Sequence, residues 1–161
     1  MLRATRSLIS ARNAYAQHPL SVVSVARSKI PDPNQPYIEA HTSYRNACRE
    51  FYKNYSSKII VGWVVQPYDP EDRCTCILHH WWNENLHGEC FDKTFSGNTK
   101  DEYVIDPTLT LLVASQEFYF EKPAFASLIL RDDKFTAFHE AKDGIMKFSE
   151  LKSLSLEEIR I

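Results

Sequence analysis

The clearest periodic pattern in the chain predicts an amphipathic helix that begins near residue 42. Either Thr42 or Ser43 can cap its N-terminus, because a side-chain oxygen there accepts hydrogen bonds from free backbone N–H groups. Apolar and aromatic residues then recur at the three- and four-residue spacing of one helix face. These residues are Tyr44, Ala47, Cys48, Phe51, Tyr52 and Tyr55. We therefore expect a helix over about residues 42–55 whose aromatic side is buried.

After this helix, runs of β-branched and aromatic residues predict a mostly antiparallel sheet. Gly62, in the middle of the first run, indicates a bulge or the close approach of another backbone. Two short runs around Arg131-Asp132-Asp133 predict a final strand pair. The expected strands cover residues 58–66, 74–83, 89–95, 102–105, 126–130 and 134–140, with a turn at 84–88.

The two ends of the chain carry weaker patterns. Residues 2–12 fit a short helix with Leu2, Leu8 and Ile9 turned inward. Four prolines in residues 13–40 predict extended connections, with an edge strand at residues 21–25. Residues 109–120 satisfy both the helix and the strand pattern, and residues 149–161 fit a final amphipathic helix. The sum is an α+β fold in which a helix packs on a mostly antiparallel sheet.

Length and composition support one folded domain. The 161 residues are 43% hydrophobic and 25% charged, which is enough for a single core. We divide this domain into a basic, Pro-rich N-terminal arm (1–41), a core (42–140) and a C-terminal helix (141–161). No apolar run approaches the roughly 20 residues that span a bilayer, so no membrane span is expected.

Charge is distributed unevenly along the chain. Residues 1–31 hold five basic and no acidic residues, which leaves 14 basic against 21 acidic residues in the rest. An acidic body disfavours nucleic-acid binding, which needs clustered Lys and Arg. The Arg- and Ser-rich start also matches an organelle transit peptide. Four irregularly spaced cysteines do not form a disulfide scaffold, so we expect a reducing, cytoplasmic setting.

Reactive side chains are densest between Cys74 and Thr94. Successive residues of a strand point to opposite faces, so His80 shares a face with Trp82 while His79 points the other way. Asp92 is expected on the returning strand of the same hairpin. A carboxylate there can accept a hydrogen bond from an imidazole, fix its tautomer and stabilise its protonated form. A nucleophile would be well placed at a helix N-terminus, where the helix dipole stabilises a developing anion.

Five short motifs, taken together, resemble a papain-like family of small bacterial or phage-encoded domains. They are Ser43-Tyr44-Arg45-Asn46-Ala47, Val61-Gly62-Trp63, His80-Trp81-Trp82, Gly88 and Asp92-Lys93-Thr94. That family has Cys-aromatic-x-Asn-Ala at a helix start, Glu-Gly-aromatic in a strand, His-x-Trp in the next strand, and then Gly and Asp-x-Thr. The motifs occur in the same order here and cover about residues 42–95, a third of the chain.

The resemblance implies a papain-like or transglutaminase-like core and an enzyme, a thiol hydrolase with a Cys-His-Asp triad. Carried onto this chain, His80 is the base, Asp92 orients it, and Ser43 stands where the family has the nucleophilic Cys. The expected reaction is acyl transfer, with amide or ester hydrolysis of a peptide, a protein or another acyl-linked substrate and no cofactor. Ser43 is compatible with a serine variant, a natural pseudoenzyme or an introduced Cys-to-Ser substitution.

Several alternatives stay open at this point. His79 also satisfies His-x-Trp, and Asp106-Pro107-Thr108 also reads Asp-x-Thr. Ser43 taken alone fits a helix cap, and Cys48 fits a buried, inert thiol. A non-catalytic interaction protein on the same fold is the competing function, with the acidic body and the basic arm as its partner surfaces.

A zinc site is a further alternative. The soft ligands Cys74, Cys76, His80 and Cys90 lie in or beside the predicted hairpin, and His87 is near. Against zinc, Cys-x-Cys lacks the two-residue gap that is usual in structural zinc sites.

Overall fold

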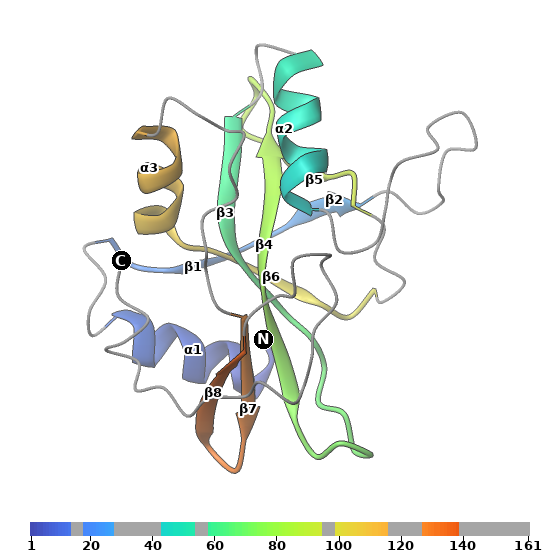
Figure 1. Ribbon diagram of the computed structural model, residues 1–161, viewed down its shortest axis with the longest axis vertical. Coiled ribbons are helices and arrows are strands. Elements are labelled where there is room, and N and C mark those ends of the chain that lie inside the picture. Colours follow the sequence, from blue (N-terminus) through green and yellow to red (C-terminus); the bar gives the residue numbers. More distant parts are fainter. Residues whose placement is uncertain (14–17, 28–42, 54–57, 95–98, 116–126, 139–161) are drawn as a thin grey trace.

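The computed structural model describes residues 1–13, 18–27, 43–53, 58–94, 99–115 and 127–138, and Figure 1 shows how its helices and strands are arranged. Three helices and eight strands occur in this part of the chain. In chain order they are α1 (Arg3–Asn13), β1 (Ser21–Val23), β2 (Val25–Arg27), α2 (Ser43–Lys53), β3 (Lys58–Val65), β4 (Thr75–Glu84), β5 (Cys90–Asp92), β6 (Glu102–Ile105), α3 (Pro107–Ser115), β7 (Ser127–Arg131) and β8 (Lys134–Phe138).

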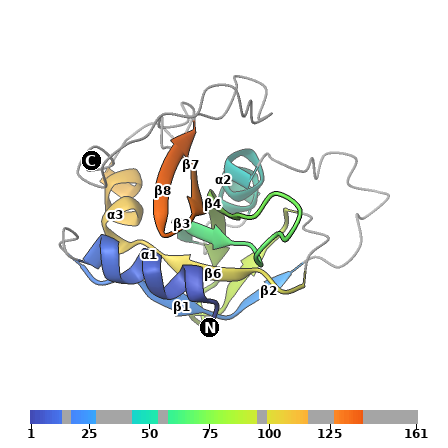
Figure 2. The same cartoon turned by 90° about the horizontal axis from the view of Figure 1, so that it is seen from below.

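The strands form one sheet that curves back on itself. Its order is β1-β6-β3-β4-β5-β2, and every pairing is antiparallel except that of β2 with β5. Only Ser24 separates β1 from β2, although these strands lie at opposite ends of the order. The sheet must therefore bend until its two outer strands meet, as the view in Figure 2 shows. The β7–β8 hairpin extends from the first residues of β4.

The outer face of this curved sheet carries the helices and the larger core. The odd-numbered residues of β3 and β4, among them Val61, Trp63 and Trp81, pack with residues of all three helices. Leu8 of α1, Ala47 of α2 and Leu109 of α3 are each at most 2% exposed. We call this side the outer face.

The even-numbered residues of β3 and β4 face the opposite side, which we call the inner face. Ile60, Val64, Trp82 and Tyr103 form a second buried cluster there. Gly62 lies on this face, opposite His80 in the β3–β4 register. A Cβ atom on Gly62 would be 2.0 Å from the backbone oxygen of Val104, which confirms the close backbone approach predicted from the sequence.

Most of the predicted elements are confirmed within one or two residues at their ends. The predicted strands 58–66, 74–83 and 102–105 correspond to β3, β4 and β6, and the helix over residues 42–55 corresponds to α2. The strand predicted over 89–95 is shorter, since β5 covers Cys90–Asp92. The ambiguous segment from residue 109 begins inside a helix, α3.

Two expectations need correction, one about the edge strand near the N-terminus and one about the buried face of α2. The expected C-terminal helix is not tested. One edge strand is predicted at residues 21–25, but the structure has two strands, β1 and β2, over residues 21–27, and they pair with β6 and β5. Tyr52, placed on the buried face of the helix by its spacing, is 44% exposed. The C-terminal helix expected at 149–161 lies outside the described residues, as does Tyr55. In the part of the chain that the structure describes, no helix has the length and apolar character needed to cross a membrane.

Candidate functional site

The inner face brings His80 of β4 and Asp92 of β5 into direct contact. The distance between His80 Nε2 and Asp92 Oδ2 is 2.7 Å. Both strands belong to one antiparallel hairpin, in which Asn83 pairs with Phe91. The even-numbered side of β4 and the side of β5 that carries Asp92 therefore share a face. The predicted pairing of His80 with Asp92 is thus present in the structure.

Asp92 is buried and held by several donors. Its side chain is 2% exposed. The Tyr103 hydroxyl donates to Oδ2 at 2.7 Å, and the Thr94 N–H donates to Oδ1 at 2.7 Å. Burial alone raises the pKa of Asp92, but the charge of His80 and the hydrogen bonds from His80, Tyr103 and Thr94 outweigh it, so the net pKa lies below its usual value. Asp92 is therefore an anion at neutral pH.

Tyr103 is suited to remain a donor in this cluster. Burial raises the pKa of its phenol, and the negative charge of Asp92 raises it further. The Arg27 guanidinium carbon lies 4.8 Å from the centroid of the Tyr103 ring, in a cation–π contact. An Arg27 amino group also donates to the backbone oxygen of Asp101, which ties this end of β2 to the segment before β6.

Aromatic rings fix the plane of the His80 imidazole. The ring stacks against Trp82 at a centroid distance of 6.3 Å and an interplanar angle of 27°. It meets Tyr103 edge-on at 5.7 Å and 80°. His80 keeps 14% of its side chain exposed, whereas Asp92 is almost fully covered. The imidazole is thus the more exposed member of the pair.

This geometry assigns separate tasks to the two nitrogens of His80. An ionised Asp92 accepts hydrogen bonds only, so Nε2 donates to it and carries the proton. In the neutral ring Nδ1 is then the acceptor. Nδ1 forms no hydrogen bond with any residue that the structure describes. The arrangement can accept a proton at Nδ1 while Asp92 stabilises the resulting imidazolium.

Ser43 is the first residue of α2 and is 9% exposed. The helix packs on the outer face, where the Tyr44 ring meets Trp81 at a centroid distance of 4.9 Å. Asn83 of the same face donates to the backbone oxygen of Ala47. His80 points to the inner face, and within the described residues no hydrogen bond joins Ser43 to either His80 or Asp92. The structure therefore brings together two of the three predicted residues, and the role of Ser43 stays a prediction.

One polar contact links α2 to the pair on the inner face. The Asn46 amide donates to the Thr94 hydroxyl at 3.2 Å, and the Thr94 backbone N–H holds Asp92. Residues three apart share one side of a helix. Ser43 therefore lies one turn before a residue that contacts the loop next to Asp92.

The rival histidine and aspartate have other surroundings. His79 lies on the outer face between the rings of Trp63 and Trp81, at centroid distances of 5.7 and 5.8 Å. Asp106 is fully buried and forms an ion pair with Arg12 at 3.0 Å. It also accepts hydrogen bonds from the Trp63 indole and from the backbone of Leu109 in the first turn of α3. These contacts give Asp106 a structural role at the start of α3.

Two thiols of this chain, Cys48 and Cys76, are unsuited to act as nucleophiles. Burial raises the pKa of Cys48 to about 11, against a smaller opposite effect of the Tyr44 hydrogen bond. This supports the interpretation of Cys48 as a buried, inert thiol. Burial likewise raises the pKa of Cys76 to about 11, with Cys74 as the next cause.

The zinc alternative finds no support in the described part of the chain. No three His, Cys, Asp or Glu side chains lie together there as a metal would require. Cys74 and Cys76 pack with Ile129, whereas Cys90 packs against the inner-face cluster.

Sequence reasoning missed Tyr103 and Arg27. Tyr103 reaches Asp92 because β3, β4, β5 and β6 curve around a common interior, although the two residues are eleven positions apart in the chain. No local spacing encodes that contact. The only sequence signal was the position of Tyr103 within the predicted strand 102–105.

Comparisons of this chain with protein-family models, with curated proteins and with solved structures gave no match.

Proposed function

We propose that this protein is an acyl-transfer hydrolase with a papain-like core, in which His80 is the base and Asp92 orients it. The observation that carries the proposal is the 2.7 Å contact between His80 Nε2 and a buried, anionic Asp92, with Nδ1 left as the accepting atom. Ser43 is the proposed nucleophile, on the strength of the resemblance of its motif and of its place at a helix start. The substrate class is an amide or ester, such as a peptide bond.

The reaction proceeds in two halves. The Ser43 hydroxyl attacks the carbonyl carbon and gives its proton to His80 Nδ1, while the backbone N–H groups at the start of α2 stabilise the oxyanion. His80 then returns the proton to the leaving amine or alcohol as its bond to carbon breaks. A water molecule hydrolyses the acyl-serine in the same manner, with His80 accepting the water proton and Ser43 regaining its own.

This chemistry requires Ser43 Oγ to approach His80 Nδ1 within hydrogen-bond distance when substrate binds. The Asn46–Thr94 contact already holds the start of α2 beside the loop that follows Asp92. Catalytic hydrogen bonds commonly tighten only in the complex with substrate. Closure at this end of α2 is therefore the conformational step that the proposal needs.

The test replaces Ser43 by Cys and follows alkylation by iodoacetamide near neutral pH, located by peptide mass spectrometry. We expect Ser43→Cys to react rapidly at residue 43, because His80 stabilises a thiolate, and to react at least about tenfold more slowly after His80→Ala. Cys48 and Cys76, whose pKa values are raised to about 11, are slow internal references in the same sample. A panel of activated esters given to the unmodified chain should leave an acyl group on Ser43.

His87→Ala is the matched control, because His87 lies in the exposed turn at residues 85–88, away from Asp92. It should leave the labelling rate of Ser43→Cys unchanged. Equal labelling in the His80→Ala and His87→Ala backgrounds would refute His80 as the partner of residue 43.

A second candidate function follows from the position of α2. Because α2 packs on the outer face and Ser43 makes no hydrogen bond with His80, the same fold can serve as a non-catalytic interaction protein. That function predicts no acylation of Ser43 by any ester of the panel and no effect of His80→Ala on labelling.

A further inference from the structure

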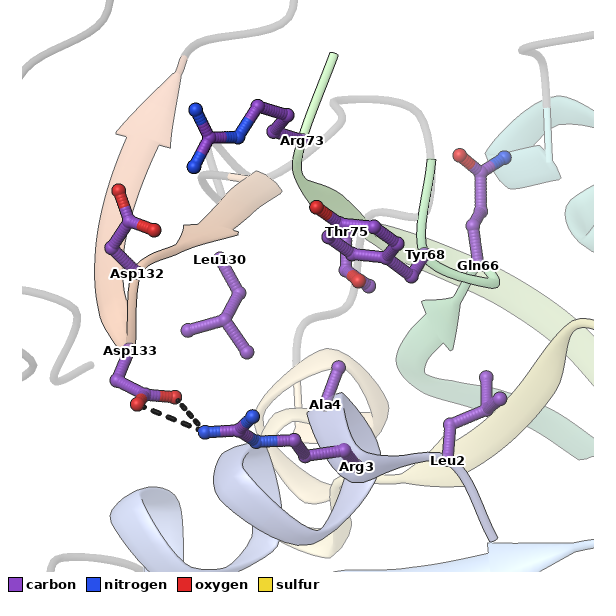
Figure 3. A pocket seen from close by; sticks show the side chains of 10 residues that line it. All are labelled: Leu2, Arg3, Ala4, Gln66, Tyr68, Arg73, Thr75, Leu130, Asp132 and Asp133. Atoms are coloured by element: carbon purple, nitrogen blue, oxygen red, sulfur yellow. Dashed lines mark hydrogen bonds and ion pairs between the residues drawn. The ribbon is translucent and has the colours of Figure 1, made fainter. Parts of the chain in front are cut away.

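A separate cavity of about 490 Å³ lies between the start of α1, the β3–β4 loop and the β7–β8 hairpin (Figure 3). It is on the outer side of β4, because Thr75 has the odd-numbered position of the outer-face residues. His80 and Asp92 face the other side. An inference from this cavity is therefore independent of the proposed hydrolase site.

Thr75 provides a buried polar group in this cavity. Its side chain and backbone together are 5% exposed, and it lines the cavity beside Leu130, its partner in the β4–β7 register. Its hydroxyl forms no hydrogen bond with any residue that the structure describes. In the described residues this hydroxyl is not one of the fully buried polar atoms without a partner, so it is accessible from the cavity and can donate a hydrogen bond to a ligand there.

Two charged residues stand at the same end of the cavity. Arg131 donates to the backbone oxygen of Asp72 at 3.1 Å, which holds the β7–β8 turn against the β3–β4 loop. The next residues in the chain, Asp132 and Arg73, line the cavity at this junction (Figure 3). Neither forms an ion pair within the described residues. By contrast, the other charged pair of the rim, Arg3 and Asp133, is joined by two contacts of 2.9 Å.

The backbone is unusual at the same place. The three non-glycine residues with positive φ in the described chain are Arg73, Asp132 and Asp133, at 52°, 47° and 60°, and all three line this cavity. The two aspartates form a two-residue hairpin turn that requires this conformation. Arg73 is the last residue of the four-residue turn between Asp69 and Cys74, whose backbones hydrogen-bond to each other, so a turn explains its conformation as well.

The rest of the wall is mainly apolar. Leu2 directly precedes α1, Ala4 lies in its first turn, and Leu130 comes from β7. The Tyr68 ring closes one side and is 60% exposed. A ligand with an uncharged, apolar body can therefore fill the space while its charged ends reach the rim.

We propose that this cavity binds a small zwitterion with an apolar body, of about the size of an apolar dipeptide. Arg73 pairs with the carboxylate as a fork of two N–H donors, and Thr75 donates a third hydrogen bond to it. Asp132 pairs with the ammonium group, while Leu2, Ala4 and Leu130 contact the apolar side chains. The volume lies within the range of small-molecule sites in proteins.

The test titrates the full chain with leucyl-leucine by calorimetry at low ionic strength. N-acetyl-leucyl-leucine lacks the ammonium and leucyl-leucinamide lacks the carboxylate, so each reports one charged contact. We expect leucyl-leucine to bind at least about tenfold more tightly than either derivative, since a charge-assisted hydrogen bond contributes about that much. In Arg73→Met, leucyl-leucine should no longer bind more tightly than leucyl-leucinamide, but it should still bind more tightly than N-acetyl-leucyl-leucine. In Asp132→Asn the reverse should hold: leucyl-leucine should lose its advantage over the acetylated peptide and keep its advantage over the amide.

Thr75→Val keeps the shape of the side chain and should weaken all ligands that carry a carboxylate. Glu71→Gln is the control, because Glu71 is an exposed acid of the same loop that does not line the cavity. It should leave every affinity unchanged. The proposal is overturned if leucyl-leucine gives no heat and no NMR shift at Thr75 or Leu130 at millimolar concentration. It is also overturned if the three peptides bind equally to the unmodified chain.

Discussion

Tyr103 and His80 hydrogen-bond to the same oxygen of Asp92, each at 2.7 Å. The two rings also meet edge-on, so the phenol and the imidazole approach the carboxylate from fixed and different directions. Two donors that bind the same carboxylate oxygen from different directions hold the Asp92 side chain in one rotamer. Tyr103 is therefore a positioning residue that acts on His80 through Asp92.

The first prediction concerns Tyr103→Phe. Removing the hydroxyl takes away one of the donors to a buried anion, and we expect the free energy of unfolding to fall by about 1.5–3 kcal/mol. In a Ser43→Cys background, alkylation should slow by several-fold because Asp92 can rotate away from His80. Its pH profile should also move, which a purely structural role of Tyr103 does not require. Urea titration and the labelling rate from pH 5 to 9 measure these effects.

Tyr68→Phe is the matched control, because Tyr68 is exposed and remote from Asp92 in the contacts of the described residues. It should change neither quantity. If Tyr103→Phe and Tyr68→Phe have the same unfolding free energy and the same pH profile of labelling, Tyr103 has no positioning role.

The sequence was sufficient for the local elements and for one half of the site. Alternation along β4 separated His79 from His80, and the step of twelve positions from His80 to Asp92 placed both on one hairpin face. The sequence was not sufficient to predict the contacts that form because the sheet curves back on itself. That closure depends on the single residue between β1 and β2 and on the parallel pairing of β2 with β5, which no periodicity encodes. For the same reason the face on which α2 packs, and with it the orientation of Ser43, could not be predicted.

A second prediction follows from the lowered pKa of Asp92. A carboxyl group whose pKa is lower in the folded than in the unfolded state stabilises the fold above its unfolded pKa, usually about 4. That contribution is lost as the pH falls through the folded pKa. We expect the unfolding free energy of the unmodified chain to fall between about pH 5 and pH 2, and the fall to be smaller in Asp92→Asn.

Acid titration of the unfolding free energy, with urea as denaturant, measures this difference. Glu71→Gln removes an exposed carboxylate and should give a curve parallel to that of the unmodified chain. Parallel curves for Asp92→Asn and the unmodified chain would mean that Asp92 is not held as a stabilised anion.

The third prediction addresses the buried ion pair of Arg12 with Asp106. These side chains are 6% and 0% exposed, so Arg12→Met leaves an anion in the core without its counter-ion. We expect a loss of about 3–5 kcal/mol in unfolding free energy. Arg6→Met, on the same helix at an exposed position, should cost far less. Equal losses in the two variants, measured by urea unfolding, would show that Asp106 does not depend on Arg12.

The last prediction concerns the backbone beside His80. Gly62 pairs with His80 on one side and with Ile105 on the other, so β3 is fixed between two strands at this residue. A Cβ atom there would meet the Val104 backbone oxygen at 2.0 Å and the Trp82 ring at 2.9 Å, and neither the backbone nor a fully buried ring can move freely.

We therefore expect Gly62→Ala to cost at least about 1–3 kcal/mol, the usual cost of adding a methyl group to a packed core, and to displace Trp82 from its stacking contact with His80. Gly88→Ala is the comparison, since Gly88 has a φ of 77° but open space around its Cα atom. Its cost should be limited to the left-handed backbone, about 1–2 kcal/mol. Urea unfolding gives the two free energies, and tryptophan fluorescence reports the surroundings of Trp82. Because only Gly62→Ala disturbs the inner face, it alone should shift the fluorescence of the folded protein. An unshifted spectrum together with equal costs for the two variants would contradict the close approach of Val104 to Gly62.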